Sequence, residues 1–323
     1  MGKADVLTAP IFIVGSGRSG TTLLRSLLSD HPDVAMLPRE SHFFNAFAGR
    51  YLGVDLGSPA AFETCWKDFV EREQFARLGV DPTVLRTEID QLEHVDLEGI
   101  FTSLLLVHAR SQGKARAGEK TPSHFRYIRT MLNWYPDAQI LFLLRDPRGV
   151  LASYLKVDQR WAKLDADTIL SAWRDSVYEI RRWNDSPSVR VVRYEHLVTE
   201  PEIALHEILD WLLLSYPSDF LDREARGGHK TGAYHQDGEV RAGSIERWQQ
   251  VLTLAQVQHT EIVLGAEMRR FGYPCVSRAV GTKERVSSEV RFRTYRARRG
   301  MGSVRDRARS LRVTRLLSEG RRT

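Results

Sequence analysis

Residues 11–24, which read IFIVGSGRSGTTLL, constrain the fold of this 323-residue chain more than any other segment. The first four form an apolar run suited to a buried parallel strand, and the glycines that follow allow a tight turn. The leucines after the turn have the spacing of a helix that packs one face on a sheet: Leu23, Leu24, Leu27 and Leu28. A strand, a glycine-rich loop and a helix in this order direct backbone N–H groups at an anion. The sequence therefore predicts an α/β fold with an anion-binding loop.

The cation of this loop is in an unusual place. The spacing from Gly15 to Gly20 matches that of an ATP-binding loop, but Thr21 stands where that motif requires lysine. Arg18, inside the loop, supplies the positive charge instead. We expect the loop to bind a phosphate-like group, but not as an ordinary Mg-ATP site.

The segment from Gly15 to Leu24 resembles the 5′-phosphosulfate loop of sulfotransferases that use 3′-phosphoadenosine 5′-phosphosulfate (PAPS). It is most similar to the branch with tyrosylprotein and many bacterial enzymes, which carry arginine where the steroid and phenol enzymes carry lysine. The resemblance implies that Arg18 neutralises the leaving phosphate. It also implies that the loop binds PAPS through Gly17, Arg18, Ser19, Gly20, Thr21 and Thr22.

A second block begins where another apolar run, residues 140–144, ends. Arg145 follows the run directly, and Ser153 comes eight residues later on an expected helix. Guanidinium binds phosphate with a planar, charge-assisted fork, and a hydroxyl adds a neutral donor. The resemblance implies that Arg145 and Ser153 hold the 3′-phosphate of PAPS. The alternative is that Arg145 pairs locally with an acid and Ser153 is an ordinary helical residue.

Two downstream segments match the same family in order. Arg241 and Gly243 resemble a late loop that closes over the 3′-phosphate, although Ala242 replaces a lysine of that loop. Tyr194 and Glu195 resemble a segment in which the tyrosine contacts the adenine and the glutamate is structural. A tyrosine hydroxyl that is satisfied locally is the alternative.

The catalytic residues are also predicted from the resemblance. Lys120, in the segment GEKTP, corresponds to a lysine that contacts the transferring sulfuryl oxygens, but Pro122 stands where the cytosolic enzymes have their catalytic histidine. Glu40 resembles the glutamate base of the tyrosylprotein and heparan branches, and a carboxylate can act as a base where burial raises its pKa. His42 is the rival base and His124 a more distant one, with a structural histidine as the alternative for both.

The positive charge of the chain is concentrated at one end. Residues 278–323 hold 15 Lys/Arg and 4 Asp/Glu, a net charge of +11, whereas the preceding residues have a net charge of −5. The main body therefore gives no reason to expect nucleic acid as a partner. The basic tail allows three interpretations: peripheral contact with anionic lipid, a docking arm for a partner, or a solvated segment.

Cysteine and histidine usage argues against disulfides and metal. Cys65 and Cys275 are the only cysteines, so we expect a reducing, cytoplasmic location, with membrane association through the tail as a further possibility. The chain has ten histidines but no cluster with metal-ligand spacing. We therefore expect no metal.

These observations predict a single α/β domain over residues 1–277 and a basic tail over residues 278–323. We expect a doubly wound parallel sheet flanked by helices, whose ligand lies beyond the carboxyl ends of the strands. The region 45–112 is expected to be a helical insertion over a substrate cleft. The expected strands are 11–14, 35–37, 140–144 and 189–192, with further amphipathic helices at 201–214 and 255–271.

The predicted reaction is in-line transfer of a sulfuryl group from PAPS to a hydroxyl or amine, with a carboxylate base and without metal. The acceptor remains open among small molecules, carbohydrates, lipids and peptides. One alternative is a kinase for a small molecule, which magnesium dependence would reveal. Another is a non-catalytic protein that binds membrane or nucleic acid through its tail, for which steep salt dependence is typical.

Overall fold

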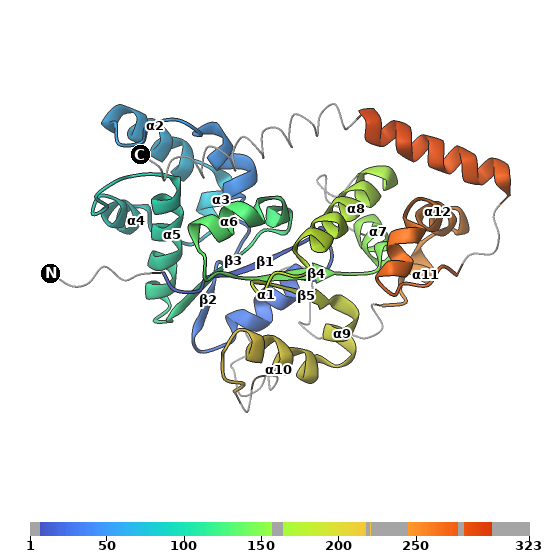
Figure 1. Cartoon of the computed structure of the whole chain (residues 1–323). Helices are drawn as coiled ribbons and strands as arrows, with labels where there is room; N and C mark the ends of the chain where they lie inside the picture. Colours follow the sequence, from blue (N-terminus) through green and yellow to red (C-terminus); the bar gives the residue numbers. More distant parts are fainter. Residues whose placement is uncertain (1–6, 157–163, 218–219, 221–244, 277–280, 299–323) are drawn as a thin grey trace.

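Five parallel strands form the single sheet of this computed structural model, which describes residues 7–156, 164–217, 220, 245–276 and 281–298. Their order across the sheet is β2-β3-β1-β4-β5. β1 lies in the middle and pairs in parallel with β3 and β4 (Figure 1). The predicted α/β class with a parallel sheet is confirmed. The strand bounds are β1 Ile11–Gly15, β2 Val34–Met36, β3 Arg116–Lys120, β4 Gln139–Leu144 and β5 Val189–Arg193.

Alternating side chains of the central strands fill two separate cores, because successive residues of a strand point to opposite faces. Phe12 and Phe142 belong to the larger core, whereas Ile13 and Leu143 belong to the smaller one. Helices α1 (Thr21–Ser29), α9 (Tyr194–Thr199) and α10 (Pro201–Trp211) cover the smaller core. The larger core is covered by α5 (Leu97–Ser111), α6 (Ile128–Trp134), α7 (Pro147–Leu155), α8 (Ala166–Trp183) and α12 (Leu254–Arg270).

Strand β3 was not among the expected strands, since its sequence, RAGEK, contains no apolar run. It nevertheless lies between β2 and β1 with its last four residues buried. The Arg116 guanidinium donates to the backbone oxygens of Ala9 and Leu212. A Cβ on Gly118 would lie 2.3 Å from the sulfur of Met36, so the strand packs too closely for a side chain there. Polar contacts and close backbone packing replace the usual apolar pattern.

Residues 45–112 are mainly helical, as expected. They contain the end of η1 (Phe43–Phe47), then η2 (Ala48–Arg50), α2 (Pro59–Val70), α3 (Glu73–Ala76), α4 (Pro82–Ile89) and α5. The last of these is the crossover helix between β2 and β3 and packs on both strands. It therefore belongs to a layer of the α/β core, while α2, α3 and α4 lie together at one end of the molecule (Figure 1). That this region covers a substrate cleft stays a prediction.

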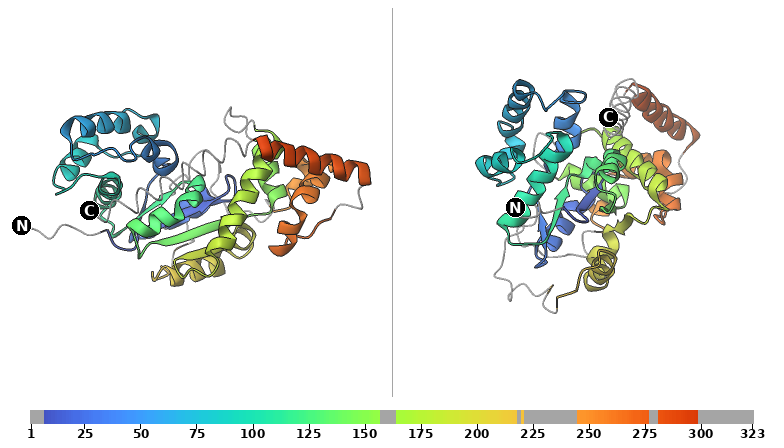
Figure 2. Two further views of the ribbon diagram at one scale, coloured as in Figure 1. Left: turned by 45° about the horizontal axis from the view of Figure 1, so that its top comes forward. Right: turned by 60° about the vertical axis from the view of Figure 1, so that its left-hand side comes forward.

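The predicted basic tail is helical over residues 282–298, within its described part. Figure 2 shows this helix beside α8 and α12, at the far end from α2. Phe292 is buried against them, and the guanidinium of Arg296 pairs with Asp175 of α8 at 3.2 Å. Residues 299–323 lie outside the described residues. Among the helices that the structure describes, none combines the length and apolar character needed to cross a membrane.

Candidate functional site

The glycine-rich loop joins β1 to α1 in the arrangement that the sequence predicts. Arg18 and Gly20 adopt left-handed backbone conformations, with φ of 67° and 96°. A Cβ on Gly20 would lie 2.4 Å from the ring of Tyr194, so glycine is required at this position. Among the described residues, no side chain caps α1. The N–H groups of its first turn are thus available to an anion.

The remaining loop residues lie in the same turn. The Ser19 hydroxyl is 2.6 Å from the Ser16 hydroxyl, and both side chains are buried. A Cβ on Gly17 would lie 2.2 Å from the Tyr154 hydroxyl, so the second glycine of the loop also allows a close approach. Thr21 is buried at the start of α1. The backbone of the loop is therefore closely packed, with a hydrogen bond between its two serines and the Tyr154 side chain against Gly17.

Arg18, Arg145, Ser153 and Tyr194, four of the predicted nucleotide-binding residues, lie together. The Arg18 Nε donates to Ser153 Oγ at 3.1 Å, and Arg145 Nη1 donates to the backbone oxygen of Arg18 at 3.0 Å. The guanidinium of Arg145 lies 4.0 Å from the centre of the Tyr194 ring. These contacts join the ends of β1, β4 and β5, so the predicted 3′-phosphate residues lie beside the predicted 5′-phosphate loop.

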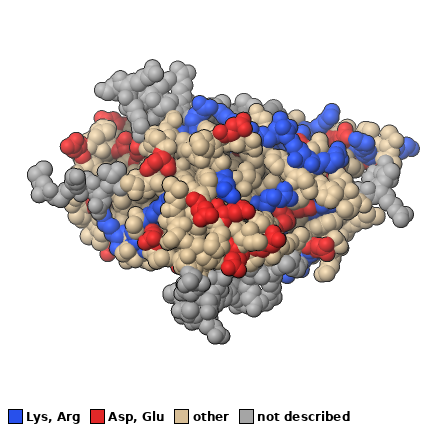
Figure 3. Space-filling view, turned by 60° about the horizontal axis from the view of Figure 1, so that its bottom comes forward, with Lys and Arg blue, Asp and Glu red and all other residues tan. Residues whose placement is uncertain are grey.

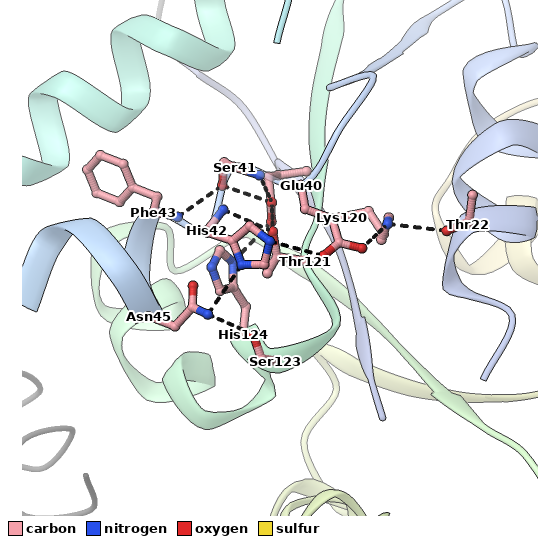
Figure 4. A network of polar contacts seen from close by, with 11 residues as sticks. Thr22, Glu40, Ser41, His42, Phe43, Asn45, Lys120, Thr121, Ser123 and His124 are labelled. Carbon is pink, nitrogen blue, oxygen red and sulfur yellow. Dashed lines mark hydrogen bonds and ion pairs between the residues drawn. The ribbon is translucent and has the colours of Figure 1, made fainter. Parts of the chain in front are cut away.

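Lys120 connects the glycine-rich loop with Glu40. Its Nζ lies at the carboxyl end of β3, 2.5 Å from Glu40 Oε1 and 3.3 Å from Thr22 Oγ1 (Figure 4). The other carboxylate oxygen of Glu40 lies 3.3 Å from His42 Nε2. The lysine is almost fully buried, while about a third of the glutamate side chain is exposed. The structure thus brings Glu40 and Lys120, two of the three predicted catalytic residues, to one edge of the sheet.

The charge of Glu40 depends on these two neighbours. Burial raises the pKa of the carboxyl group, but the hydrogen bond from His42 and the charge of Lys120 outweigh that effect and lower it to about 2. Glu40 is therefore ionised throughout the neutral range. Its ionised form stabilises the fold above about pH 4.5, and this contribution is lost as the pH falls toward 2.

His42 is oriented by a contact on each ring nitrogen. Its Nδ1 lies 3.3 Å from the amide nitrogen of Asn45, which also donates to Ser123 Oγ at 3.1 Å. Because an amide nitrogen can only donate, Nδ1 accepts and Nε2 carries the proton that points at Glu40. His124, in contrast, is fully buried beside Glu119, so its ring is not accessible to an acceptor substrate. His42 and Glu40 thus remain the candidate bases.

Glu195 joins two strand ends. It accepts a hydrogen bond from the backbone N–H of Asp146 and another from the hydroxyl of Tyr273, each at 2.9 Å. These contacts fit the structural role that the resemblance implies.

Two of the predicted residues, Arg241 and Gly243, lie outside the described residues. Within the described part of the chain, no group of three or more His, Cys, Asp or Glu residues is arranged to hold a metal ion. The sequence analysis missed Ser41, Asn45, Glu119 and Thr121, which surround the Glu40–Lys120 pair. The polar strand RAGEK, followed by threonine, was the available signal for two of them.

Comparison with known proteins identifies the family of this chain. The model of the sulfotransferase family matches residues 10–218. Protein-tyrosine sulfotransferase 2 of Gallus gallus is 25% identical over 258 residues, which are 73% of this chain and 58% of that protein. Carbohydrate sulfotransferase 1 of Danio rerio is 23% identical over 183 residues, 49% of this chain and 44% of that protein. The chain thus spans about half the length of these two relatives.

A solved structure has the same fold. The sulfotransferase domain from the curacin biosynthetic pathway is 18% identical, with a TM-score of 0.55, and the match covers 84% of this chain and 99% of that domain. A parallel sheet with a glycine-rich loop, and basic residues gathered beside it, is an arrangement that binds anionic groups. This chain belongs to the sulfotransferase family, and sulfuryl transfer is the reaction of that family.

Proposed function

We propose that this sulfotransferase moves a sulfuryl group from PAPS to a hydroxyl or amine acceptor by in-line displacement, with Glu40 as the base. One observation carries the proposal: Lys120 contacts both Thr22 at the glycine-rich loop and Glu40. A lysine in this position can interact with a group bound at the loop while an acceptor lies next to the carboxylate. PAPS supplies the activated sulfuryl group, and the protein supplies position and charge.

The hydrogen-bond donors and cations of the site fit a nucleotide with phosphate groups at two positions. The uncapped start of α1 and Arg18 suit the 5′ end, since backbone N–H groups and guanidinium both favour anions. Arg145, stacked on Tyr194 and joined to Arg18, suits the 3′-phosphate and the adenine next to it. All these groups are donors or cations, which is consistent with transfer that needs no metal.

Glu40 would accept the proton of the acceptor as the new bond to sulfur forms. In the structure its carboxylate is shared between Lys120 and His42, which makes it a weak base. When the negatively charged PAPS contacts Lys120, the ion pair between Lys120 and Glu40 would weaken. The pKa of Glu40 would then rise toward its usual value. The base therefore gains strength when the donor is bound.

The direct test is transfer of radiolabelled sulfate from PAPS to a panel of phenols, sugars, lipids and tyrosine peptides in the presence of a chelator. We expect one acceptor class to become labelled, and Lys120→Met to abolish the labelling. Protein-tyrosine and carbohydrate acceptors are the first to screen, because relatives carry those names. Absence of labelling together with consumption of Mg-ATP would instead support a kinase.

Replacement of His42 separates the two candidate bases. If Glu40 is the base, His42→Ala removes the hydrogen bond that lowers its pKa most, so that pKa rises from about 2 toward 4.5. The acid limb of the kcat/KM profile then shifts to higher pH but stays below about pH 5. Turnover falls by no more than ~10-fold. His94→Ala, at an exposed histidine, is the control. A different result would identify His42 as the base: a loss of turnover of ~100-fold or more in His42→Ala, together with an acid limb of the wild-type kcat/KM profile in the pH range where imidazole titrates.

We also propose that the helix over residues 282–298 brings the enzyme to anionic lipid surfaces. It carries exposed Lys283, Arg285 and Arg293, with exposed Val286 and Val290 between them. Basic and apolar side chains that are exposed on one helix favour such a surface. Basic side chains also gather along the upper right of the face in Figure 3, whereas acidic ones gather near its middle.

Co-sedimentation with vesicles tests this proposal. We expect binding to phosphatidylcholine vesicles only when phosphatidylglycerol is present, weakened by salt and by reversal of the three basic charges to glutamate. Reversal of Lys67 and Arg77, exposed at the other end of the molecule, is the control and should leave binding unchanged. Equal binding to both kinds of vesicle, or no binding, would contradict it.

A further inference from the structure

Glu119 is a fully buried carboxylate that the proposed reaction does not use. It lies on β3, directly before Lys120. Its Oε1 accepts hydrogen bonds from the backbone N–H of Ser41 at 3.2 Å, from the Ser41 hydroxyl at 2.9 Å and from the Thr121 hydroxyl. Its Oε2 lies 3.1 Å from His124 Nδ1, which is the fourth donor. These four donors occupy both oxygens of the carboxylate and come from Ser41, Thr121 and His124.

The donors keep Glu119 ionised in spite of its burial. Burial raises the pKa of a carboxyl group, but His124 and the hydroxyl groups of Thr121 and Ser41 outweigh this effect, so the pKa of Glu119 lies below its usual value. A charge buried without such partners would be strongly destabilising. Glu119 therefore holds its four donors with charge-assisted hydrogen bonds, which are stronger than neutral ones.

These bonds join the two segments that carry the reacting groups. Ser41 lies between Glu40 and His42, and Thr121 follows Lys120 directly. The hydroxyl oxygen of Thr121 also faces the backbone N–H of His42 at 3.4 Å (Figure 4). Glu40 and Lys120 are 80 residues apart in the chain, and Glu119 holds the residue next to each of them.

We propose that Glu119 is a positioning residue for sulfuryl transfer, which fixes the carboxylate of Glu40 relative to the ammonium group of Lys120. The proposal rests on the proposed role of Glu40. A displacement of about 1 Å at reacting groups can cost ~100-fold in rate, so a residue that fixes their separation affects turnover without touching the substrate. His124 has a supporting role, as the donor that holds the second oxygen of Glu119.

Glu119→Gln tests the proposal with little change of shape. The amide oxygen can still accept from Ser41, while the amide nitrogen can donate to His124 Nδ1 if the histidine proton moves to Nε2. In the wild-type structure, His124 Nε2 has no hydrogen-bond partner among the described residues. We expect kcat to fall ~10- to 100-fold, with the affinity for 3′,5′-adenosine bisphosphate (PAP) nearly unchanged. Glu261→Gln, at another buried acid that accepts from Arg148, is the control for loss of stability alone.

A double-mutant cycle with Glu40→Gln separates positioning from a general loss of structure. If Glu119 acts through Glu40, Glu119→Gln adds little to the loss caused by Glu40→Gln. Fully additive losses, or kcat in Glu119→Gln equal to that of Glu261→Gln, would overturn the proposal. If Glu40→Gln is fully active while Glu119→Gln is not, the proposed base is wrong, and the two failures are thereby distinguished.

Hydrogen exchange gives a readout that does not depend on activity. The Ser41 amide should exchange faster in Glu119→Gln than in the wild type or in Glu261→Gln, because its acceptor has lost its charge. His124→Asn, which can offer a side-chain N–H to Glu119, should retain more activity and protection than His124→Leu. Unchanged exchange at Ser41, or equal behaviour of the two His124 variants, would overturn the proposal.

Discussion

Replacing Glu40 by glutamine is expected to lower kcat by ~100- to 10,000-fold, the range that general-base catalysis contributes. Glutamine has nearly the same shape but cannot take the proton of the acceptor. Affinity for PAP should stay the same or rise slightly, because the ion pair with Lys120 is lost and the lysine becomes available to the nucleotide. Single-turnover kinetics with PAPS and calorimetry with PAP measure the two quantities separately.

Glu40→Asp is the matched variant, since it keeps the carboxylate but shortens its reach. We expect it to retain more turnover than Glu40→Gln. Full activity of Glu40→Gln would contradict the assignment and would move the base to His42 or to the acceptor itself. A parallel loss of PAP affinity would instead indicate that Glu40 orders the donor site.

Replacing Arg145 by alanine is expected to weaken PAP binding by ~10- to 100-fold, the effect of losing a charge-assisted hydrogen bond. The guanidinium is held between the backbone oxygen of Arg18 and the ring of Tyr194, so it has one fixed position at the end of β4. AMP, which lacks the 3′-phosphate, should lose little affinity. Calorimetry with both nucleotides on both proteins gives the comparison.

Arg145→Lys is the corresponding conservative variant. It keeps the charge but not the planar fork, so its affinity for PAP should lie between those of the wild type and Arg145→Ala. Equal losses of affinity for PAP and AMP would refute the 3′-phosphate role. In that case Arg145 would support the glycine-rich loop through Arg18 rather than bind the nucleotide directly.

The parts of the fold that the sequence predicts are those with local signals. β1, β4 and α1 carry apolar runs or helical periodicity, and the glycines between β1 and α1 show where the chain turns. β3 carries no such signal, because Gly118 and Glu119 are selected by contacts with distant segments. Such contacts depend on the finished sheet, so a local pattern does not reveal them.

The same distinction holds for the candidate site: some of its residues have a signal in the sequence, and others are set by contacts between distant segments. Arg145 at the end of an apolar run and Lys120 in its motif are visible from sequence and from the family resemblance. The hydrogen bonds from Ser41 to Glu119 link positions 78 residues apart, and none of the expected strands contained Glu119. The pKa of Glu40 is lowered by the hydrogen bond from His42, two residues away, and by the charge of Lys120, which only the folded chain brings near.

Calorimetric binding of PAP without magnesium, compared with AMP and with Mg-ATP, tests the central claim most directly. The claim is that the glycine-rich loop and the residues around Arg145 form a site for a nucleotide phosphorylated at both the 3′ and 5′ positions. We predict that PAP binds without metal and at least ~10-fold more tightly than AMP. Preference for Mg-ATP, or equal affinity for PAP and AMP, would contradict the claim.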